Sequence, residues 1–204
     1  MGVAIRRAGE GDREDVVRLL DAAFMQDPVS SWIFPGEEYR LRTHGALMGA
    51  FFDLALSEGY VDITEDGAAV ALWWSVPAGE HHEGDDDGPA LLRQAVDADN
   101  ERVETVGRLT EAIHPTDRAH EYLHLIAVHP DRQGEGLGTA LVTAVLDRCD
   151  REGLHAYLEA SNTRSRDLYT RLGFAFMGTT LDLPDGPRMW PMWREPRTAG
   201  EAAV

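Results

Sequence analysis

The stretch EYLHLIAVHPDRQGEGLGTALV, residues 121–142, decides the fold. Its first eight residues form a mostly apolar run typical of a central β-strand, which ends at His129-Pro130. The glycine-rich turn QGEGLG at 133–138 follows, and an amphipathic helix begins directly after it. A helix N-terminus has unpaired backbone N–H groups, and glycines let a phosphate approach the backbone closely. The turn predicts either a pyrophosphate cradle or a plain connection between strand and helix.

The same signals, read outward from this stretch, predict an α/β fold. Runs with β propensity are bounded by turn residues, and the remaining segments carry apolar residues at helical spacing. We expect strands at 3–7, 60–64, 68–76, 121–128, 155–160, 174–183 and 188–194. We expect helices at 9–24, 38–57, 90–113, 137–152 and 163–172. An ordered, partly apolar loop is expected at 25–37, and a solvated acidic loop, rather than a calcium site, at 78–90.

Charge and composition exclude several functions. The formal net charge is −17, and all 19 basic residues are arginines because the chain has no lysine. A phosphate loop, a pyridoxal enzyme and a Schiff-base aldolase each need a lysine, so these chemistries are excluded. The acidity argues against nucleic acid as a partner and suits a cationic substrate, although it could equally serve solubility alone.

The compartment is predicted from the cysteine and from the apolar runs. The single cysteine, Cys149, lies among apolar residues at helical spacing, which favours a buried, reduced thiol over a nucleophile. No run resembles a signal peptide or approaches the roughly 20 apolar residues of a membrane span. We therefore expect a cytoplasmic protein with no membrane partner.

If the turn binds a phosphate, two sequence patterns could describe it. A dinucleotide fold requires G-x-G-x-x-G and an acidic residue about 20 positions later, where Glu159 stands. The glycines here are spaced G-x-G-x-G instead, the turn lies two-thirds along the chain, and no repeated βαβ units surround it. The other pattern, R/Q-x-x-G-x-G/A, is satisfied by Gln133, Gly136 and Gly138.

This second pattern resembles the GNAT superfamily of acyl-CoA-dependent N-acyltransferases. The resemblance continues through LEASNTRSRDLYTRLGF and covers residues 121–174, the expected CoA-binding core. Within the superfamily, DAAFMQDP, DGAAVALW and PDGPRMWPM resemble puromycin N-acetyltransferase and its relatives. The length of the chain favours one domain, over 1–195, and the tail at 196–204 is expected to be disordered. The resemblance implies a mixed, twisted sheet of about seven strands, splayed between the fourth and fifth and flanked by helices.

Family positions imply how acetyl-CoA, the expected co-substrate, would be held. The pantetheine arm would pair with the backbone of the fourth strand, the pyrophosphate would lie on the turn, and Arg132 would supply a nearby positive charge. Asn162 would contact the CoA arm, cap the following helix, or do both. The residues so implied are Ile126, Ala127, Val128, Arg132, Gln133, Gly134, Glu135, Gly136, Leu137, Gly138, Thr139 and Asn162.

Two residues are implied to carry the chemistry. Tyr169 occupies the family's general-acid position and would protonate the departing CoA thiolate, although it could also pack in the core. The attacking amine must be neutral, so a base is needed, and the candidates on the fourth strand are Glu121, Tyr122 and His124. HLIAVH resembles HALAVH of arylalkylamine N-acetyltransferases, in which the matching histidine is a catalytic candidate. This favours His124 as the base.

Two rival functions remain to be weighed. His120-Glu121-Tyr122-Leu123-His124 matches the zinc-protease signature H-E-x-x-H, but that signature needs a helix. On a strand the two histidines would lie about 13 Å apart, too far to share a metal, so we expect no metal site. A non-catalytic acyl-CoA-binding module is the other rival, and the presence of Tyr169 argues against it.

The expected function is the transfer of an acetyl group from acetyl-CoA to an amine of a small molecule. Asp27, Trp32 and Phe34 are candidate wall residues of the acceptor site, because acidic and aromatic groups together suit an amine. Trp32 and Phe34 could instead serve only in packing. A monomer or a homodimer would be ordinary for such a protein.

Overall fold

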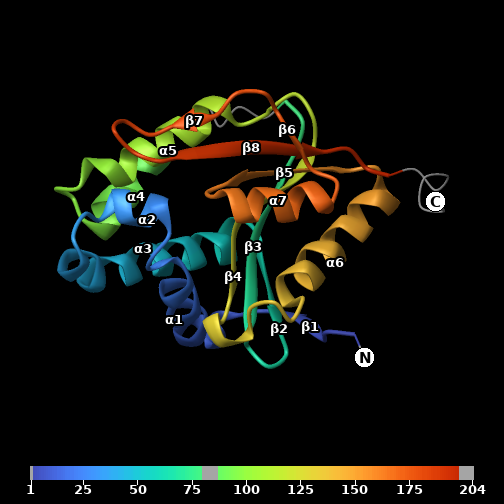
Figure 1. The fold of residues 1–204 in the computed structure, drawn as a ribbon, viewed down its shortest axis with the longest axis horizontal. Coiled ribbons are helices and arrows are strands. Elements are labelled where there is room, and N and C mark those ends of the chain that lie inside the picture. Colours follow the sequence, from blue (N-terminus) through green and yellow to red (C-terminus); the bar gives the residue numbers. More distant parts are fainter. Residues whose placement is uncertain (1, 80–86, 198–204) are drawn as a thin grey trace.

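The computed structural model describes residues 2–79 and 87–197 of the chain (Figure 1). The strands are β1 (Ile5–Arg7), β2 (Tyr60–Thr64), β3 (Ala69–Val76), β4 (His120–Val128), β5 (His155–Ala160), β6 (Ala175–Phe176), β7 (Leu181–Asp182) and β8 (Arg188–Arg194). The helices are α1 (Arg13–Phe24), α2 (Pro28–Ile33), α3 (Glu37–Glu58), α4 (Gly88–Val96), α5 (Glu101–Ile113), α6 (Leu137–Glu152) and α7 (Thr163–Arg171). Short 3₁₀ turns lie at Glu10–Asp12 and Pro130–Arg132.

The strands form one mixed, strongly twisted sheet in the order β1-β2-β3-β4-β5-β8-β6, with β7 pairing β8 at its far end. Strands β1 to β4 are antiparallel neighbours, whereas β4 and β5 run parallel. That parallel pairing extends only from His120 to Leu123, opposite His155 to Leu158. Beyond it the two strands diverge, as Figure 1 shows, so the predicted α/β class and the splay between the fourth and fifth strands are confirmed.

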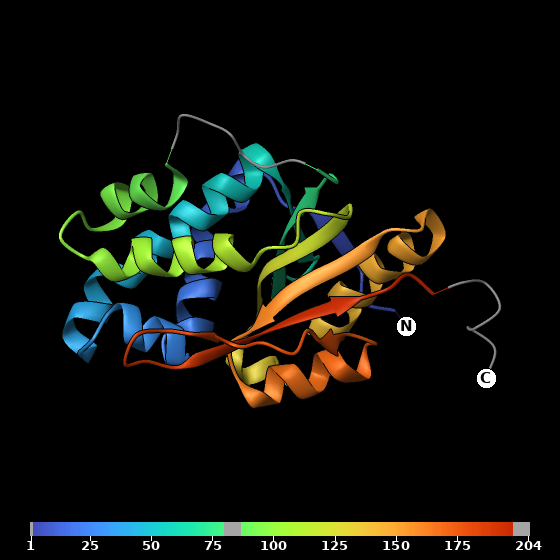
Figure 2. The same cartoon turned by 90° about the horizontal axis from the view of Figure 1, so that it is seen from above.

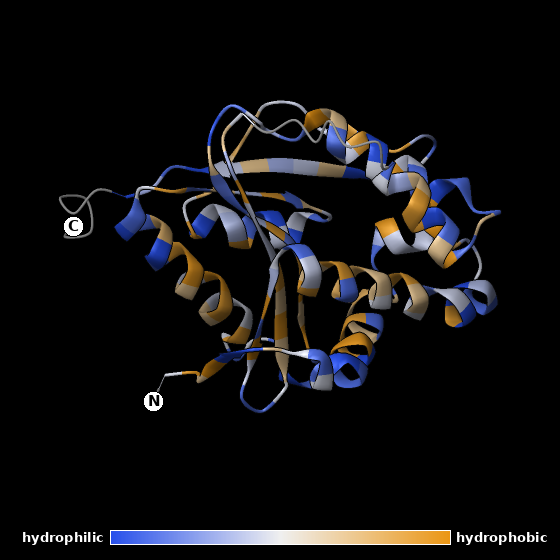
Figure 3. Ribbon diagram, turned by 180° about the vertical axis from the view of Figure 1, so that it is seen from behind, coloured by the Kyte–Doolittle hydropathy of each residue, from blue (hydrophilic) through white to orange (hydrophobic). Residues whose placement is uncertain are grey.

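Two apolar cores lie on opposite faces of the sheet. Because successive side chains of a strand point to opposite faces, Ala69, Ala71 and Trp73 of β3 join one core while Val70 and Leu72 join the other. Helices α6 and α7 cover the first face, and α1 to α5 cover the second (Figure 2). Figure 3 shows the hydrophobic residues gathered along β2 to β4 and along one side of α6.

Helix α6 follows its sequence signals closely. Gly136 at its N-terminus and Gly153 at its C-terminus both adopt left-handed backbone conformations, with φ of 81° and 71°. Cys149 is fully buried, as predicted, and burial raises its thiol pKa to about 11, which disfavours the thiolate form. The buried face of the helix consists of Leu137, Leu141, Val142, Val145, Leu146 and Cys149.

The structure differs from the predicted elements at three places. The single helix expected at 90–113 is two helices, because the Asn100 side chain accepts from the Arg102 N–H and starts α5 afresh. The loop expected at 25–37 contains α2, whose N-terminus is capped by the Asp27 carboxylate. The run at 174–183 is interrupted, so that β6 and β7 are short separate strands.

Parts of two further predictions fall on residues that are not described. These are the acidic loop at 78–90, most of which lies at 80–86, and the tail at 196–204 beyond residue 197. Among the described helices, none combines the length and the apolar character that a membrane crossing requires.

Candidate active site

The glycine turn forms an open loop at the N-terminus of α6. Gly134 and Gly136 both have positive φ, at 86° and 81°, and nothing lies within 4 Å of where a Cβ would stand on either residue. A Cβ on Gly138, by contrast, would meet Val128 at 3.3 Å, so this glycine lets α6 pack closely against β4. The 16-residue helix directs its unpaired N–H groups and the positive end of its dipole toward the open loop. The loop therefore fits an anionic group such as a pyrophosphate.

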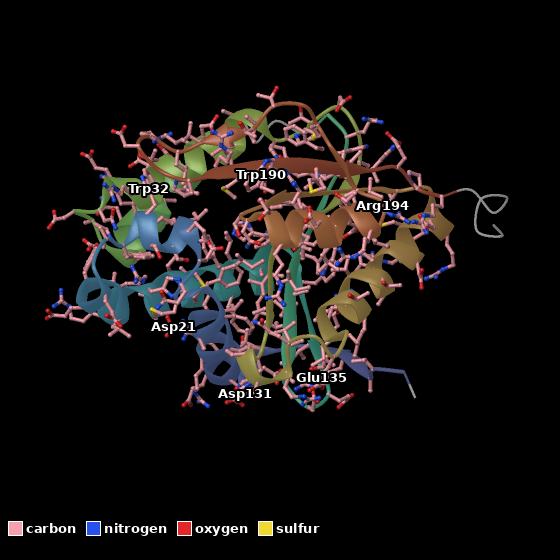
Figure 4. The ribbon with its side chains drawn as sticks, viewed as in Figure 1. Asp21, Trp32, Asp131, Glu135, Trp190 and Arg194 are labelled. Carbon is pink, nitrogen blue, oxygen red and sulfur yellow. The ribbon has the colours of Figure 1, made fainter. Side chains whose placement is uncertain are left out.

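Arg132 is engaged with acidic neighbours beside this loop. Its guanidinium donates to Glu135 at 2.7 Å and to Asp66 at 3.2 Å, and all three side chains are exposed. Figure 4 places Glu135 and Asp131 together at this turn, far from Trp32 and Trp190 at the other end of the molecule. The expected positive charge is thus close to the loop, but its neighbours already neutralise it.

The last residues of β4 have one strand partner instead of two. Ile126, Ala127 and Val128 pair with β3, whereas the pairing with β5 has already ended at Leu123. The register with β3 shifts at Leu72/Trp73, which face Leu125 and Leu123, and His124 is the extra residue between them. A backbone edge that lacks its second partner can bind an extended polar chain.

Half-buried polar side chains lie together where β4 and β5 part. The Tyr122 hydroxyl lies 2.9 Å from Oε2 of Glu159 and 3.0 Å from Nδ1 of His124. Nε2 of His124 and Oε1 of Glu159 are both buried, and neither has a hydrogen-bond partner among the described residues. Burial lowers the pKa of His124 to about 4 and raises the pKa of Glu159 to about 7. The cluster therefore contains two proton acceptors whose hydrogen-bonding capacity is incomplete.

Glu121, another residue expected as a possible base, lies in a different environment. It accepts from the Tyr60 hydroxyl at 2.5 Å and from the Ser75 hydroxyl at 2.9 Å, and it pairs with Arg148 at 3.2 Å. Both of its oxygens are thus occupied by fixed donors. Of the three candidates on β4, only Tyr122 and His124 join the cluster at the splay.

The sequence alone did not predict that Glu159 belongs to this cluster. It suggested Glu159 only as the acidic residue of a dinucleotide fold. The alternating pattern of HAYLEA shows which face of β5 it occupies, but nothing in that pattern sets the register of β5 against β4. The observed register pairs Tyr122 with Tyr157, so Glu159 lies just beyond the last paired residues.

Tyr169 and Asn162 both lie on α7, which packs against β5 and β6. Tyr169 is 6% exposed and packs edge-on against Phe174, and its hydroxyl makes no hydrogen bond to the described residues. Burial raises its pKa, so the phenol stays protonated. The Asn162 carbonyl oxygen accepts from the Ser165 N–H at 2.9 Å, which confirms its expected role as a helix cap.

The three candidate wall residues have different surroundings. Asp27 accepts from the hydroxyl of Ser161, just after β5, at 2.7 Å, which ties the N-terminus of α2 to the end of that strand. Trp32 donates from its indole to the Pro184 carbonyl at 2.9 Å and so joins α2 to the turn before β8. Phe34 is fully buried, so its role is in packing and the wall assignment is wrong for this residue.

A second set of hydrogen-bonded polar side chains joins α2 to α1 and α3. His44 donates from Nδ1 to Asp21 at 2.7 Å, and its Nε2 lies 3.0 Å from the Ser30 hydroxyl. This is the residue set of a hydrolase triad, but Ser30 is 5% exposed and His44 is fully buried. These side chains therefore fix α2 onto α1 and α3 rather than presenting a nucleophile.

The H-E-x-x-H segment is a strand, as expected. His120 donates from Nδ1 to the Arg118 carbonyl and contacts His114, whereas His124 bonds to Tyr122. The two histidines thus have separate partners. Within 2–79 and 87–197, no three His, Cys, Asp or Glu side chains are grouped to hold a metal ion.

The chain matches known proteins through this same region. A model of the acetyltransferase (GNAT) family matches residues 48–174, more than half of the chain. The chain belongs to the GNAT family. The matched residues include the open turn, the single-partnered end of β4, and both Tyr169 and His124.

Curated GNAT relatives match only in part. A mycothiol acetyltransferase of Pseudarthrobacter chlorophenolicus is 37% identical over 42% of this chain and 28% of its own length. A methionine sulfoximine and methionine sulfone acetyltransferase of Pseudomonas paraeruginosa is 40% identical over 27% of this chain and 34% of its own. The chain thus spans about a third or less of each. These relatives support the family, but they do not support the finer resemblance to puromycin N-acetyltransferase.

A solved GNAT structure resembles the whole chain. The Corynebacterium glutamicum structure, described as a histone acetyltransferase and related acetyltransferase, is 25% identical. It has a TM-score of 0.68 and covers 97% of this chain and 98% of its own. The likeness extends to the helices α1 to α5 outside the shared CoA region, which supports the fold as a whole.

Proposed function

We propose that this protein transfers an acetyl group from acetyl-CoA to the amine of a small molecule. The observation that carries the proposal is that two features, one at the N-terminus of α6 and one at the end of β4, occur together. One is the open, left-handed glycine turn at the helix N-terminus, and the other is the end of β4 that lacks its second strand partner. Together they suit a ligand with an anionic group joined to an extended amide chain.

The residues that would hold acetyl-CoA follow from this geometry. Residues 133–139 would bind the pyrophosphate through backbone N–H groups, and Ile126 to Val128 would pair with the pantetheine amides. Asn162 would contribute its amide nitrogen, because its carbonyl oxygen already caps α7. Acetyl-CoA supplies the thioester, and the chain supplies binding, orientation and proton transfer.

Tyr169 is proposed as the proton donor to the departing thiolate. A phenol is a weaker acid than a thiol in water, so donation requires an interior where the thiolate is also destabilised. Burial raises the pKa of Tyr169, and it does the same to any thiol in that environment, as at Cys149. The donor and its acceptor would therefore remain matched inside the closed site.

His124 is proposed as the base that takes a proton from the amine. Because its pKa is lowered to about 4, the imidazole is neutral at physiological pH and offers a lone pair. Its Nε2 atom is buried and has no partner among the described residues, so a bound ammonium could donate to it.

The acceptor is proposed to be a small amine. The two curated relatives are named for small molecules, mycothiol and methionine sulfoximine or sulfone. A net charge of −17 would attract a cationic amine and repel nucleic acid. A monomer or a homodimer, in the cytoplasm, would suit this role.

The proposal is tested first by thermal unfolding of the purified chain with acetyl-CoA, CoA, NAD or zinc. A ligand that binds only the folded state raises the unfolding temperature. We expect a rise with acetyl-CoA and CoA, whereas a rise with NAD or zinc alone would contradict the proposal. Thiol release from acetyl-CoA is then measured with agmatine, tryptamine and L-methionine sulfone. Binding without turnover on a broad amine panel would favour the non-catalytic acyl-CoA-binding module instead.

A further inference from the structure

Glu159 occupies a position that the proposed reaction has not yet used. It is the first residue of β5 beyond the parallel pairing with β4, and it shares the Tyr122 hydroxyl with His124. Pro191, opposite it on β8, carries no side-chain proton donor. Tyr122 donates the hydrogen bond to Oε2 of Glu159, at 2.9 Å, and the Tyr157 hydroxyl also acts on the carboxylate and lowers its pKa.

The hydrogen-bond directions in this chain are fixed by one charge. An ionised carboxylate only accepts, so the Tyr122 hydroxyl donates to Oε2 of Glu159. The Tyr122 oxygen must then accept from Nδ1 of His124, which requires that tautomer of the imidazole. Nε2 of His124 is consequently the unprotonated nitrogen, and it is the atom that has no partner. The lone pair on Nε2 of His124 is thus connected, through the Tyr122 hydroxyl, to the carboxylate of Glu159.

We propose that Glu159 is the final acceptor of the proton that leaves the amine, and that His124 and Tyr122 pass the proton to it. The assignment rests on the proposed acetyl transfer. His124 would be the residue that touches the amine, while Tyr122 and Glu159 act through it.

The proton transfers balance without any further reactant. The ammonium gives a proton to Nε2 of His124, the Nδ1 proton moves to the Tyr122 oxygen, and the original hydroxyl proton moves to Oε2 of Glu159. His124 ends neutral as the other tautomer, and Glu159 ends as a neutral acid. The amine then attacks the thioester carbonyl carbon and the C–S bond breaks. The second proton leaves the nitrogen as the amide forms and replaces the proton that Tyr169 has given to the CoA sulfur. After the products leave, the proton on Glu159 returns along Tyr122 and His124 and passes from Nε2 to water, which restores the starting tautomer.

The relay explains how a buried histidine can serve as a base. Holding a cation on His124 alone is unfavourable, because its ring packs edge-on against Phe51 and Trp74. If the proton moves on to Glu159, no cation forms on the imidazole and the negative charge of the carboxylate disappears. The pKa of Glu159 is raised to about 7 by burial, which suits a group that must take up and release a proton near neutrality.

The groups that face these three hydrogen-bonded residues are all aromatic side chains. Tyr157, the neighbour of Glu159 on the same strand, has a buried hydroxyl, and its ring contacts His114 from the segment after α5. His114 also contacts the rings of Tyr122 and His120. Trp74 and Phe51 complete the wall from β3 and α3. No fixed cation of the described residues bonds to Glu159, so protonation is its route to neutrality.

The first test needs no substrate. Nitrogen-15 NMR of the imidazole side chains, with His124 identified by the loss of its signals in His124→Gln, should show the neutral tautomer protonated at Nδ1 at pH 8, where Glu159 is ionised. Its shifts should inflect near pH 7 as Glu159 titrates, and the inflection should vanish in Glu159→Gln. A tautomer protonated at Nε2 at pH 8, or an inflection that persists in Glu159→Gln, would overturn the proposed proton relay.

The second test uses turnover of agmatine, tryptamine or L-methionine sulfone, whichever the wild type acetylates fastest. The pH profile of kcat should fall on the acid side near pH 7, because protonated Glu159 can accept nothing more. Glu159→Gln and Tyr122→Phe should each lower kcat by about a hundredfold or more and remove that inflection. Tyr60→Phe is the matched control, since its hydroxyl also bonds a buried glutamate but lies outside the cluster, and it should keep the profile.

The outcomes separate this inference from the proposed function. If the wild type neither binds acetyl-CoA nor releases thiol, the acetyl transfer itself fails, and the NMR experiment still decides the hydrogen-bond chain. If the wild type is active and Glu159→Gln keeps its pH profile, the acetyl transfer stands and Glu159 is not the acceptor. If Glu159→Gln is impaired while Tyr122→Phe is not, the route through Tyr122 is wrong.

Discussion

Two glutamates, the buried Glu121 and the half-buried Glu159, lie on the neighbouring strands β4 and β5 and have opposite surroundings. Glu121 accepts from two hydroxyls and pairs with Arg148, so each of its oxygens is held by a fixed donor. Glu159 accepts from the Tyr122 hydroxyl at 2.9 Å, and Tyr157 also acts on it, but its Oε1 atom is buried and has no hydrogen bond of ordinary geometry among the described residues. Glu121 is 2% exposed, whereas Glu159 is half-buried and its Oε1 atom is enclosed. The chemical difference is the incomplete hydrogen bonding at Glu159, which leaves a carboxylate able to take up a proton.

Two tyrosines, the half-buried Tyr60 and the buried Tyr169, show the same contrast. The Tyr60 hydroxyl donates to Glu121 and accepts from Arg148, whereas the Tyr169 hydroxyl makes no hydrogen bond to the described residues. Groups whose hydrogen bonds are all made, such as Glu121 and Tyr60, hold the sheet to α6. Groups with an unused hydrogen-bonding position, such as Glu159 and Tyr169, can still bind a substrate or a proton.

The largest expected effect is on stability, at Glu121. Glu121→Ala leaves Arg148 without its ion-pair partner and the Tyr60 and Ser75 hydroxyls without their acceptor. We therefore expect a loss of about 3–5 kcal/mol in the free energy of unfolding. Urea unfolding followed by fluorescence measures it. The acid-side inflection of kcat should remain in the folded fraction. A loss below about 1 kcal/mol would mean that Glu121 does not hold the sheet as its contacts indicate.

Tyr169→Phe should have the opposite effect, a large loss of turnover with little change in stability. Without a proton donor, the thiolate leaves more slowly, and kcat should fall by about 10²- to 10³-fold between pH 6 and 9. Stability should change by less than about 1 kcal/mol, because the lost hydroxyl has no hydrogen bond to the described residues.

Tyr60→Phe is the matched change at a hydroxyl whose hydrogen bonds are all made. It should cost about 1–3 kcal/mol of stability and leave kcat within a few-fold of the wild type. Unchanged turnover in Tyr169→Phe would remove the general-acid assignment.

The third effect is a pH dependence of stability at Glu159. With a pKa raised to about 7, Glu159 binds more protons in the folded than in the unfolded state between about pH 4.5 and 7. Folding stability from this group therefore falls as pH rises through that range. Glu159→Gln removes the effect, so the variant should gain up to roughly 3 kcal/mol relative to wild type between pH 4.5 and 8. Urea titrations at both pH values measure the change, and a constant difference would contradict a neutral buried carboxyl.

Local signals predicted most of the fold, because strand, turn and helix each carry a short-range pattern. The CoA region follows them nearly residue by residue, from the strand end at Val128 to the helix end before Gly153. The break between α4 and α5 was missed because the apolar spacing continues across it. There the Tyr39 hydroxyl, distant in sequence, bonds to both Asp97 and Asn100 and stabilises the turn.

The candidate site was predictable only where it is local. The turn at 133–138 is contiguous, and the family resemblance supplied Tyr169 and His124. The cluster at the splay depends instead on two non-local facts, the register of β5 against β4 and the extra residue at His124 in the register with β3. Neither follows from the alternation of one strand, so the sequence placed Glu159 on a strand without showing what it faces.

The smallest expected effect compares the two glycines at the ends of α6. Gly136 and Gly153 both have positive φ, and neither has a neighbour within 4 Å of its Cβ position. Replacing either by alanine should cost a similar amount of stability, about 1 kcal/mol, because the strain is the same left-handed conformation. Urea unfolding of Gly136→Ala and Gly153→Ala tests this equality.

Acetyl-CoA affinity should distinguish the two variants. Gly136 lies in the proposed cradle, where relief of the strained φ would turn the N–H groups of the loop away from a pyrophosphate, whereas Gly153 lies at the opposite end of a 16-residue helix. Calorimetry with acetyl-CoA should give a Kd raised about tenfold or more in Gly136→Ala and unchanged in Gly153→Ala. Equal affinities in two folded variants would contradict the cradle. A loss in Gly153→Ala as large as in Gly136→Ala would show that the affinity tracks helix stability rather than the shape of the loop.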